Sequence, residues 1–161
     1  MQVEMKIKGL MVDPVTNMPI VILQDESDER VLPIWVGIFE ANAIALRIED
    51  IETPRPMTHD LLRNLLESLQ ASVEKIVVSE LKDNTYFAQI HLQVDGSARQ
   101  IDARPSDAIA LALRTEAPIY VEQEVLEQSS ALDENGEPSD SERLRRWFEN
   151  LDTDDFSKYE M

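Results

Sequence analysis

The side chains best suited to chemistry gather in the segment Asp102-Ala103-Arg104-Pro105-Ser106-Asp107, which we expect to turn from a strand into a helix. Free backbone N–H groups and the positive end of the helix dipole favour anions at such a turn. Asp102 and Asp107 could bind a hard cation such as Mg²⁺ or Mn²⁺, while Arg104 holds a phosphate oxygen. The Ser106 hydroxyl lies in the same turn. A structural interpretation is also open, because a carboxylate in a first helical turn stabilises the helix dipole by itself.

A second segment, Arg55-Pro56-Met57-Thr58-His59-Asp60, also places an Arg-Pro pair before the start of an expected helix. His59 is a candidate general base or fourth metal ligand, and Asp60 would add negative charge beside it. The structural alternative is that Thr58 caps the helix and that His59 and Asp60 are solvated first-turn residues. Glu40 occupies the matching helix start in the first third of the chain, where it could complete a metal site or simply cap the helix.

The composition excludes several classes of site. The chain has 161 residues and no cysteine, which excludes a disulfide scaffold, a thiol nucleophile and a Cys-ligated metal. With 2 histidines and 4 glycines, a multi-histidine metal site and a glycine-rich phosphate loop are excluded as well. The sequence contains neither an apolar signal core nor the ~18 uninterrupted apolar residues of a membrane span. We therefore expect a cytoplasmic protein without a membrane partner.

The net charge of −17 is the dominant feature of the composition. It is −11 over residues 1–128 and −6 over residues 129–161, so acidic side chains outnumber basic ones in both parts. Affinity for nucleic acid comes largely from Lys and Arg that replace counterions on the phosphates, and the sequence contains no cluster of basic residues suited to this. If nucleic acid is a substrate, we expect it to be bound weakly, with divalent cations bridging carboxylate and phosphate.

Hydrophobic periodicity predicts the elements that position these residues. Alternating apolar residues predict strands over 3–10, 19–23, 31–36, 73–81, 85–94, 97–102 and 118–121. Apolar residues at three- and four-residue spacings predict helices over 38–49, 58–70 and 105–114. The core stripe of the second helix is predicted at Leu61, Leu62, Leu65, Leu66 and Leu69. Because strands and helices are partly segregated, we expect an α+β fold with a mixed, largely antiparallel sheet packed with about three helices.

The composition also predicts how the chain is divided. We expect residues 1–128 to form one domain, residues 129–140 a polar linker, and residues 141–161 an acidic C-terminal tail with a short amphipathic helix. The apolar face of this helix consists of Leu144, Trp147, Phe148 and Leu151. The helix either docks on its own domain or binds a hydrophobic groove of a protein partner.

Two segments of the chain resemble each other at an offset of 65 residues, namely Glu40–Leu46 and Pro105–Leu111. Each follows an expected strand, and both contain Ala-Ile-Ala-Leu. The two halves could be related units whose helix starts are placed alike. Alternatively, Ala-Ile-Ala-Leu is a good filler for any buried helix.

Four motifs occur together along the first 128 residues. In chain order they are Leu32–Gly37 running into Glu40-Ala41, then Arg55–Leu62, Ile101–Ala112 and Ala117–Val121. Together they resemble the bifunctional nuclease domain family, which was long catalogued as a domain of unknown function. The polar positions of the family's motifs correspond to Glu40, His59, Asp60, Asp102, Arg104, Ser106 and Asp107.

The resemblance implies a compact α+β domain, often a homodimer, with a nuclease activity toward RNA and DNA in some members. From it we expect metal-assisted phosphodiester hydrolysis, with Asp102 and Asp107 holding Mg²⁺ or Mn²⁺ and Glu40 as a third ligand. His59 would activate water, and Arg104 would stabilise charge on the phosphate.

One alternative to a nuclease is a small-anion or nucleotide-binding protein. Another is a non-catalytic regulatory or protein-interaction module of the same fold. In that case the Asp/Arg turn would be a structural network. The leucine-rich helix 58–70 suits either a buried homodimer face or a core helix that is covered by its own domain.

Overall fold

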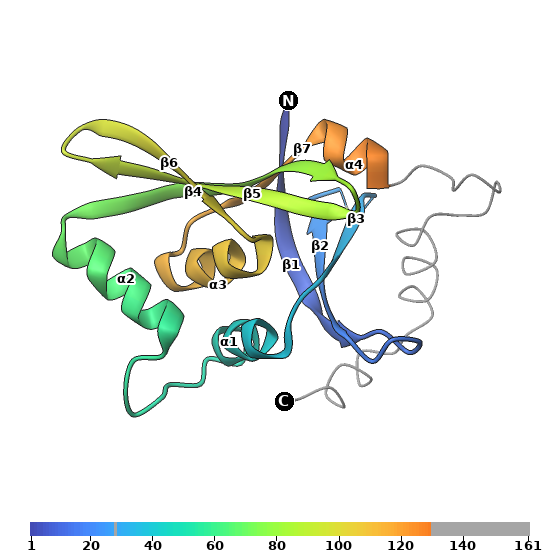
Figure 1. The fold of residues 1–161 in the computed structure, drawn as a ribbon, viewed down its shortest axis with the longest axis horizontal. Helices are drawn as coiled ribbons and strands as arrows, with labels where there is room; N and C mark the ends of the chain where they lie inside the picture. Colours follow the sequence, from blue (N-terminus) through green and yellow to red (C-terminus); the bar gives the residue numbers. More distant parts are fainter. Residues whose placement is uncertain (28, 130–161) are drawn as a thin grey trace.

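The computed structural model describes residues 1–27 and 29–129 of the chain (Figure 1). The strands are β1 (Gln2–Val12), β2 (Pro19–Asp25), β3 (Val31–Trp35), β4 (Ala71–Lys82), β5 (Thr85–Val94), β6 (Ser97–Ala103) and β7 (Ile119–Glu122). The helices are α1 (Ile38–Ile48), α2 (Thr58–Ser68), α3 (Pro105–Thr115) and α4 (Gln123–Ser129). The predicted α+β class is confirmed.

The seven strands of the described residues form one sheet in the order β3-β2-β1-β7-β4-β5-β6. The strands β1, β2 and β3 form one antiparallel meander, and β4, β5 and β6 form a second. Between them lies β7, which pairs antiparallel with β1 and parallel with β4. This short strand therefore joins the two meanders into the mixed, largely antiparallel sheet that the sequence predicts.

The helix α3 is the centre of the core. Its residues from Ala108 to Ala112 are all buried, because the helix contacts α1, α2, β4 and β5. Its alanines, together with Ala41 and Ala43 of α1, keep the side chains at the helix contact small and so allow close packing. The two segments that resemble each other in sequence are therefore the two helices that pack together.

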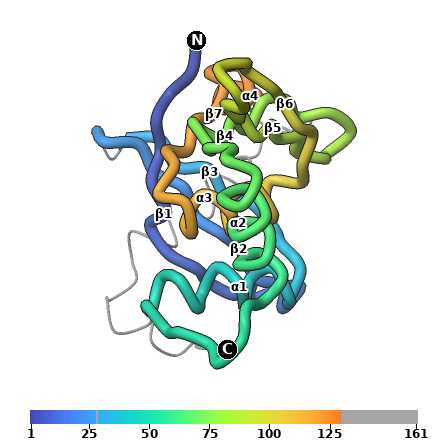
Figure 2. The backbone as a smooth tube through the Cα atoms, turned by 90° about the vertical axis from the view of Figure 1, so that its left-hand side faces the viewer, coloured from blue at the N-terminus to red at the C-terminus, as the bar shows by residue number. Residues whose placement is uncertain are grey.

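The predicted leucine stripe of α2 does not enter the core. Its residues Leu61, Leu62, Leu65 and Leu69 are 40–70% exposed, whereas the buried residue of this helix is His59. The helix lies at one end of the molecule, facing the viewer in Figure 2, and contacts α3 and β4. Periodicity identified the helix correctly, but its apolar face is largely exposed and does not form part of the core.

Besides shifts of one or two residues at their C-terminal ends, the helices differ from the prediction in two features. Met57, not Thr58, is the N-cap of α2, and its backbone N–H donates to the Asp60 carboxylate at 3.0 Å. A further helix, α4, follows β7 directly and buries Val125 and Leu126. Its seven residues are too short to produce a helical period in the sequence.

Part of the predicted organisation lies outside the described residues. This applies to the amphipathic helix of the tail at 141–161 and to the linker after residue 129. Within residues 1–27 and 29–129, no helix has the length and apolar character that crossing a bilayer requires.

Candidate functional site

Three helix starts meet in one network of side chains. Glu40 lies in the first turn of α1, His59 in the first turn of α2, and Arg104 and Asp107 at the start of α3. Arg104 Nη2 donates to Glu40 Oε1 and to Asp107 Oδ2, each at 2.7 Å. Arg104 Nε donates to the same Asp107 oxygen at 3.0 Å, and His59 Nε2 lies 2.9 Å from Asp107 Oδ1. We call these four residues the helix-start network.

The backbone enters α1 and α3 in the same way. Gly37 and Arg104 are the N-caps, with extended φ,ψ of −72°,160° and −70°,143°. Pro105 then occupies the first helical position. An N–H at this position has no acceptor within the helix, so proline loses no hydrogen bond there, and its ring fixes φ. A Cβ on Gly37 would clash with the Glu40 carboxylate. Glycine therefore provides the space in which Glu40 reaches Arg104.

Asp107 is ionised at neutral pH in this network. Burial by itself would raise the pKa of Asp107, but the hydrogen bonds from His59 and Arg104 and the charge of Arg104 hold the pKa below its usual range. An ionised carboxylate can only accept hydrogen bonds, so His59 Nε2 donates to Asp107 Oδ1, and Nδ1 is the other nitrogen of the ring. The hydrogen bonds to Glu40 and Asp107 in turn raise the pKa of Arg104.

The network runs from a buried residue to an exposed one. The side chain of His59 is 9% exposed, that of Asp107 31% and that of Arg104 65%. The hydrogen bonds of the Arg104 guanidinium to other described residues use Nε and Nη2. Its Nη1 group therefore remains available to an anion.

A groove of about 280 Å³ lies beside Arg104 and Ser106. Its walls include Trp35, Tyr86 and Asn84. The Trp35 Nε1–H donates to Asp13 Oδ2 at 2.9 Å, which holds the indole in place. Ser106 is 7% exposed, so little of its surface reaches the groove. Aromatic side chains next to a guanidinium can hold a base and its phosphate together.

Asp60 makes a different set of contacts from its neighbour in the chain. Its Oδ1 accepts from Arg114 Nε at 2.7 Å, and its Oδ2 accepts from the Met57 N–H. The side chain of Arg114 is 1% exposed and also donates to backbone carbonyls of α3 and α1 at 2.9 and 3.0 Å. Burial would raise the pKa of Asp60, but the hydrogen bonds from Met57 and Arg114 lower it. Asp60 thus ties α2 to α3 and stays apart from the helix-start network.

Asp102 is also apart from the network, although it is close in sequence. Side chains alternate between the two faces of a sheet along a strand. Ala103 packs against the core on the helix side, so Asp102, which pairs with Gln89 of β5, projects from the other face and is exposed. The three ligands expected from the sequence, Glu40, Asp102 and Asp107, are therefore not assembled.

The donor set does not fit the expected Mg²⁺ or Mn²⁺ site. Glu40 and Asp107 both bind Arg104, whose guanidinium already supplies the positive charge between them. Across residues 1–27 and 29–129, no group of three or more His, Asp or Glu side chains is arranged to hold a metal ion.

Sequence reasoning missed Arg114, Trp35 and Tyr86. Arg114 resembles an ordinary cation in the last turn of a helix, where it favours the helix dipole. One signal was present, because Arg114 follows Asp107 by seven residues and therefore lies on the same face of α3. The two aromatic residues come from β3 and β5, which are separated by four strands in the sheet, so their place in one groove depends on tertiary structure rather than on a local pattern.

Comparison with known proteins gives a consistent assignment. A family model described as "Bifunctional nuclease domain" matches residues 21–134. An uncharacterised protein of Mycobacterium tuberculosis is 36% identical over 162 residues, which cover 95% of this chain and 97% of that protein. Bifunctional nuclease 1 of Arabidopsis thaliana is 27% identical to this chain, and bifunctional nuclease 1 of Oryza sativa subsp. japonica is 24% identical. Both matches cover 70% of this chain, but they cover 36% and 35% of the two plant proteins. The chain belongs to the bifunctional nuclease domain family.

Proposed function

We propose that this protein hydrolyses phosphodiester bonds of RNA, DNA or both at the helix-start network. The observation that carries the proposal is the unbroken run of hydrogen bonds from Glu40 through Arg104 and Asp107 to His59, next to an aromatic-lined groove. The plant proteins named bifunctional nucleases support the reaction class. We also propose the cytoplasm as its compartment, since a chain without cysteine suits a reducing environment.

His59 would act as the general base. Asp107 orients the ring by accepting the Nε2–H, and its charge stabilises the imidazolium that forms. His59 Nδ1 takes a proton from water, the water oxygen attacks phosphorus, and the bond from phosphorus to the leaving oxygen breaks. The leaving oxygen then takes a proton from solvent. General base catalysis of this kind accelerates a reaction by roughly 10²–10⁴.

Arg104 would bind the phosphate under attack. A guanidinium stabilises the negative charge that builds up on phosphoryl oxygens in the transition state. Glu40 and Asp107 already neutralise much of its charge, so this one cation should add little affinity for nucleic acid in the ground state. Weak substrate binding is also what the net charge of −17 predicts.

Trp35 and Tyr86 would receive an unpaired base of the substrate. Stacking of a base on an aromatic side chain is worth about 1–3 kcal/mol and tolerates any sequence. Bases within a duplex are already stacked on one another, so the groove favours single strands. We therefore propose single-stranded RNA or DNA as the substrate.

The test is hydrolysis of labelled single-stranded RNA and DNA by the purified protein and three variants. Asp107→Asn and His59→Gln should each lower the rate by at least about a hundredfold. Asp102→Asn makes the same change as Asp107→Asn on the other face of the sheet and should keep the wild-type rate. Parallel reactions with Mg²⁺, with Mn²⁺ and with chelator measure separately whether the rate depends on a divalent cation.

The outcomes discriminate between site and function. Hydrolysis that survives Asp107→Asn, or that falls equally in Asp102→Asn, would refute the proposed site. A folded wild-type protein that cleaves neither nucleic acid under any of the cation conditions would refute the nuclease itself.

The exposed apolar face of α2 favours a second candidate function, a non-catalytic interaction module. Large exposed apolar patches mark protein interfaces, and Leu61, Leu62, Leu65 and Leu69 form one here. We propose that a second copy of the chain covers this face and forms a homodimer. The segment 141–161, outside the described residues, would recruit a different protein partner. For such a module, Asp107→Asn should lower stability alone, and deletion of 141–161 should release the partner.

A further inference from the structure

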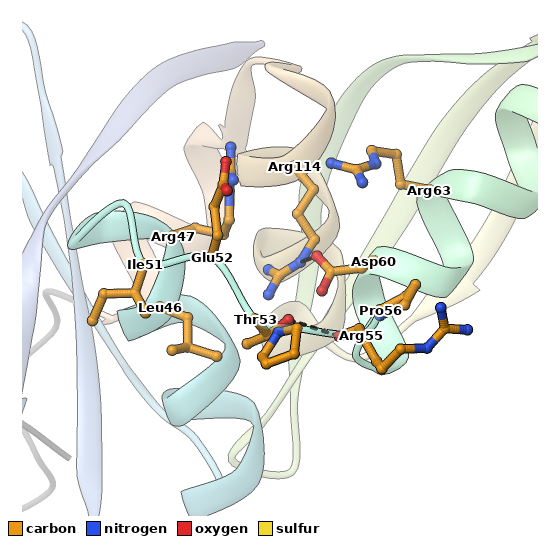
Figure 3. A pocket seen from close by; sticks show the side chains of 11 residues that line it. Leu46, Arg47, Ile51, Glu52, Thr53, Arg55, Pro56, Asp60, Arg63 and Arg114 are labelled. Atoms are coloured by element: carbon orange, nitrogen blue, oxygen red, sulfur yellow. Dashed lines mark hydrogen bonds and ion pairs between the residues drawn. The ribbon is translucent and has the colours of Figure 1, made fainter.

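Four arginines from separate parts of the chain line one pocket of about 250 Å³ (Figure 3). They are Arg47, Arg55, Arg63 and Arg114, four of the seven arginines in the described residues. The pocket lies between the end of α1, the loop that follows it, α2 and the end of α3. The sequence contains no basic cluster because these residues are spread from position 47 to position 114. The fold assembles one in a chain whose net charge is −17.

The positive charge of this arginine pocket is not cancelled. Two carboxylates, those of Glu52 and Asp60, also line it. Asp60 pairs with Arg114, whereas no ion pair joins the other three arginines to any residue in the described part of the chain. Three guanidinium groups are therefore matched by the single carboxylate of Glu52, which leaves the pocket net positive.

Two of the arginines have unmet or weak hydrogen bonds. Arg47 Nε is buried and has no acceptor among the described residues. Buried donors are almost always paired in proteins, so Arg47 gains an acceptor if its side chain turns toward an anion in the pocket. Arg63 shares the side-chain oxygen of Asn64 between Nε and Nη2, at 3.4 and 3.2 Å. A charged acceptor would make shorter and stronger bonds, so Arg63 can turn toward one.

The remaining walls limit the size and character of a ligand. Ile51, Pro54 and Pro56 provide apolar surface against which a flat ring can lie. The Thr53 hydroxyl donates to the Arg55 carbonyl at 2.8 Å and so holds the loop in shape (Figure 3). The volume is smaller than that of most pockets for drug-sized ligands, so it suits a small anion or an anion with one ring system.

We propose that the arginine pocket binds a phosphate dianion, either as the phosphate group of a mononucleotide or as free inorganic phosphate. Guanidinium groups bind phosphate oxygens in parallel pairs, and several of them together match the charge of a phosphate dianion. The choice of a mononucleotide rests on the proposed nuclease function, because phosphodiester hydrolysis produces phosphomonoester ends. Recognition of the phosphate group itself does not depend on that function.

The arginine pocket and the helix-start network are separate sites. Arg104 precedes α3 and Arg114 lies in its last turn, so their backbones are ~15 Å apart along the helix. Ligand binding at the arginine pocket can therefore be measured without hydrolysis, and its outcome is independent of whether the protein is an active nuclease.

The test is isothermal titration calorimetry with inorganic phosphate, AMP and adenosine at constant ionic strength. Phosphate or AMP should bind the wild-type protein, and adenosine should not. Arg47→Gln and Arg63→Gln should each weaken binding by at least about tenfold, the loss expected for one charge-assisted hydrogen bond. Arg99→Gln makes the same change on the exposed strand β6 and should leave binding unchanged. Circular dichroism verifies that each variant is folded.

Each outcome decides the proposal. Binding of both AMP and phosphate supports the proposal and shows that the free anion is sufficient. Binding of AMP without binding of phosphate supports the proposal and shows that the ligand is the mononucleotide. Equal binding of adenosine and AMP, no binding of either phosphate compound, or equal weakening by Arg99→Gln would overturn it. Binding of a single-stranded oligonucleotide without binding of AMP or phosphate would also overturn it, and would make the pocket part of a nucleic-acid interface.

Discussion

Variants of the two arginines at the ends of α3 should distinguish a loss of hydrolysis from a loss of stability. Arg104 and Arg114 each bind an aspartate, but their side chains are 65% and 1% exposed. Arg104→Gln and Arg114→Gln remove the same charge from the two ends of one helix. The pair of variants therefore compares an exposed ion pair with a buried one in the same surroundings.

The free energy of unfolding should respond very differently to the two changes. Ion pairs of exposed side chains contribute about 0–1 kcal/mol, so Arg104→Gln should lower the free energy of unfolding by less than about 1 kcal/mol. Arg114→Gln leaves Oδ1 of Asp60 and two helix carbonyls without the donors that Arg114 supplies. Breaking a buried pair in this way costs about 3–5 kcal/mol, a large part of the 5–15 kcal/mol that is typical of a whole domain.

Arg104→Gln, the variant that keeps its stability, should lose hydrolysis. If Arg104 stabilises charge in the transition state, Arg104→Gln should lower kcat/KM for single-stranded RNA by about a hundredfold, the effect of removing one such donor. Because this variant stays folded, loss of stability cannot explain the loss of rate.

Urea unfolding, followed by circular dichroism, measures the free energies for both variants, and an unchanged m-value confirms that the change is in stability. Equal losses of stability would contradict the burial argument. An Arg104→Gln protein that is strongly destabilised but hydrolyses at the wild-type rate would refute the functional role of Arg104.

Other perturbations test the remaining parts of the structure. Burial, followed by the charge of Lys75, lowers the pKa of His91. The unfolded chain therefore takes up this proton first, so thermal stability should fall as the pH drops below about 6.5, and His91→Gln should flatten that dependence. Gly37→Ala should push the Glu40 carboxylate off Arg104 and lower kcat with little change in stability; an unchanged kcat would show that Glu40 is dispensable. Leu65→Glu should convert the proposed homodimer to a monomer in light scattering, and equal masses for both proteins would exclude α2 as the dimer face.

The fold was predictable from the sequence wherever an apolar pattern met the core directly. In β5, Ala88 is buried in the core and Ile90 packs against it, and the alternation along this strand predicts its bounds. The leucines of α2 form an equally clear pattern, but the prediction that they lie in the core was wrong. A periodic pattern indicates that a helix has an apolar face, but it does not indicate which surface covers that face.

The helix-start network was predictable only in part. Arg104 and Asp107 are three residues apart and meet within one turn, and Glu40 was expected from its place at the matching helix start. Asp102 failed because the prediction treated the end of a strand and the start of a helix as one cluster, although alternation with Ala103 directs it to the other face. The arginine pocket depends on contacts between distant segments and has no local signal in the sequence.

The helix α2 connects the sites that the sequence keeps apart. His59 joins the helix-start network through Asp107, and the next residue, Asp60, joins the arginine pocket through Arg114. The leucines of the same helix are exposed, so few apolar contacts hold α2 in place. Segments with few buried contacts are the ones that move most easily, and a second copy that covered the leucines would fix the position of α2. Phosphate in the arginine pocket would bias the same helix through Asp60. The proposed dimer contact and the proposed ligand therefore both act on the helix that carries the proposed base. Each would influence hydrolysis by changing the position of His59.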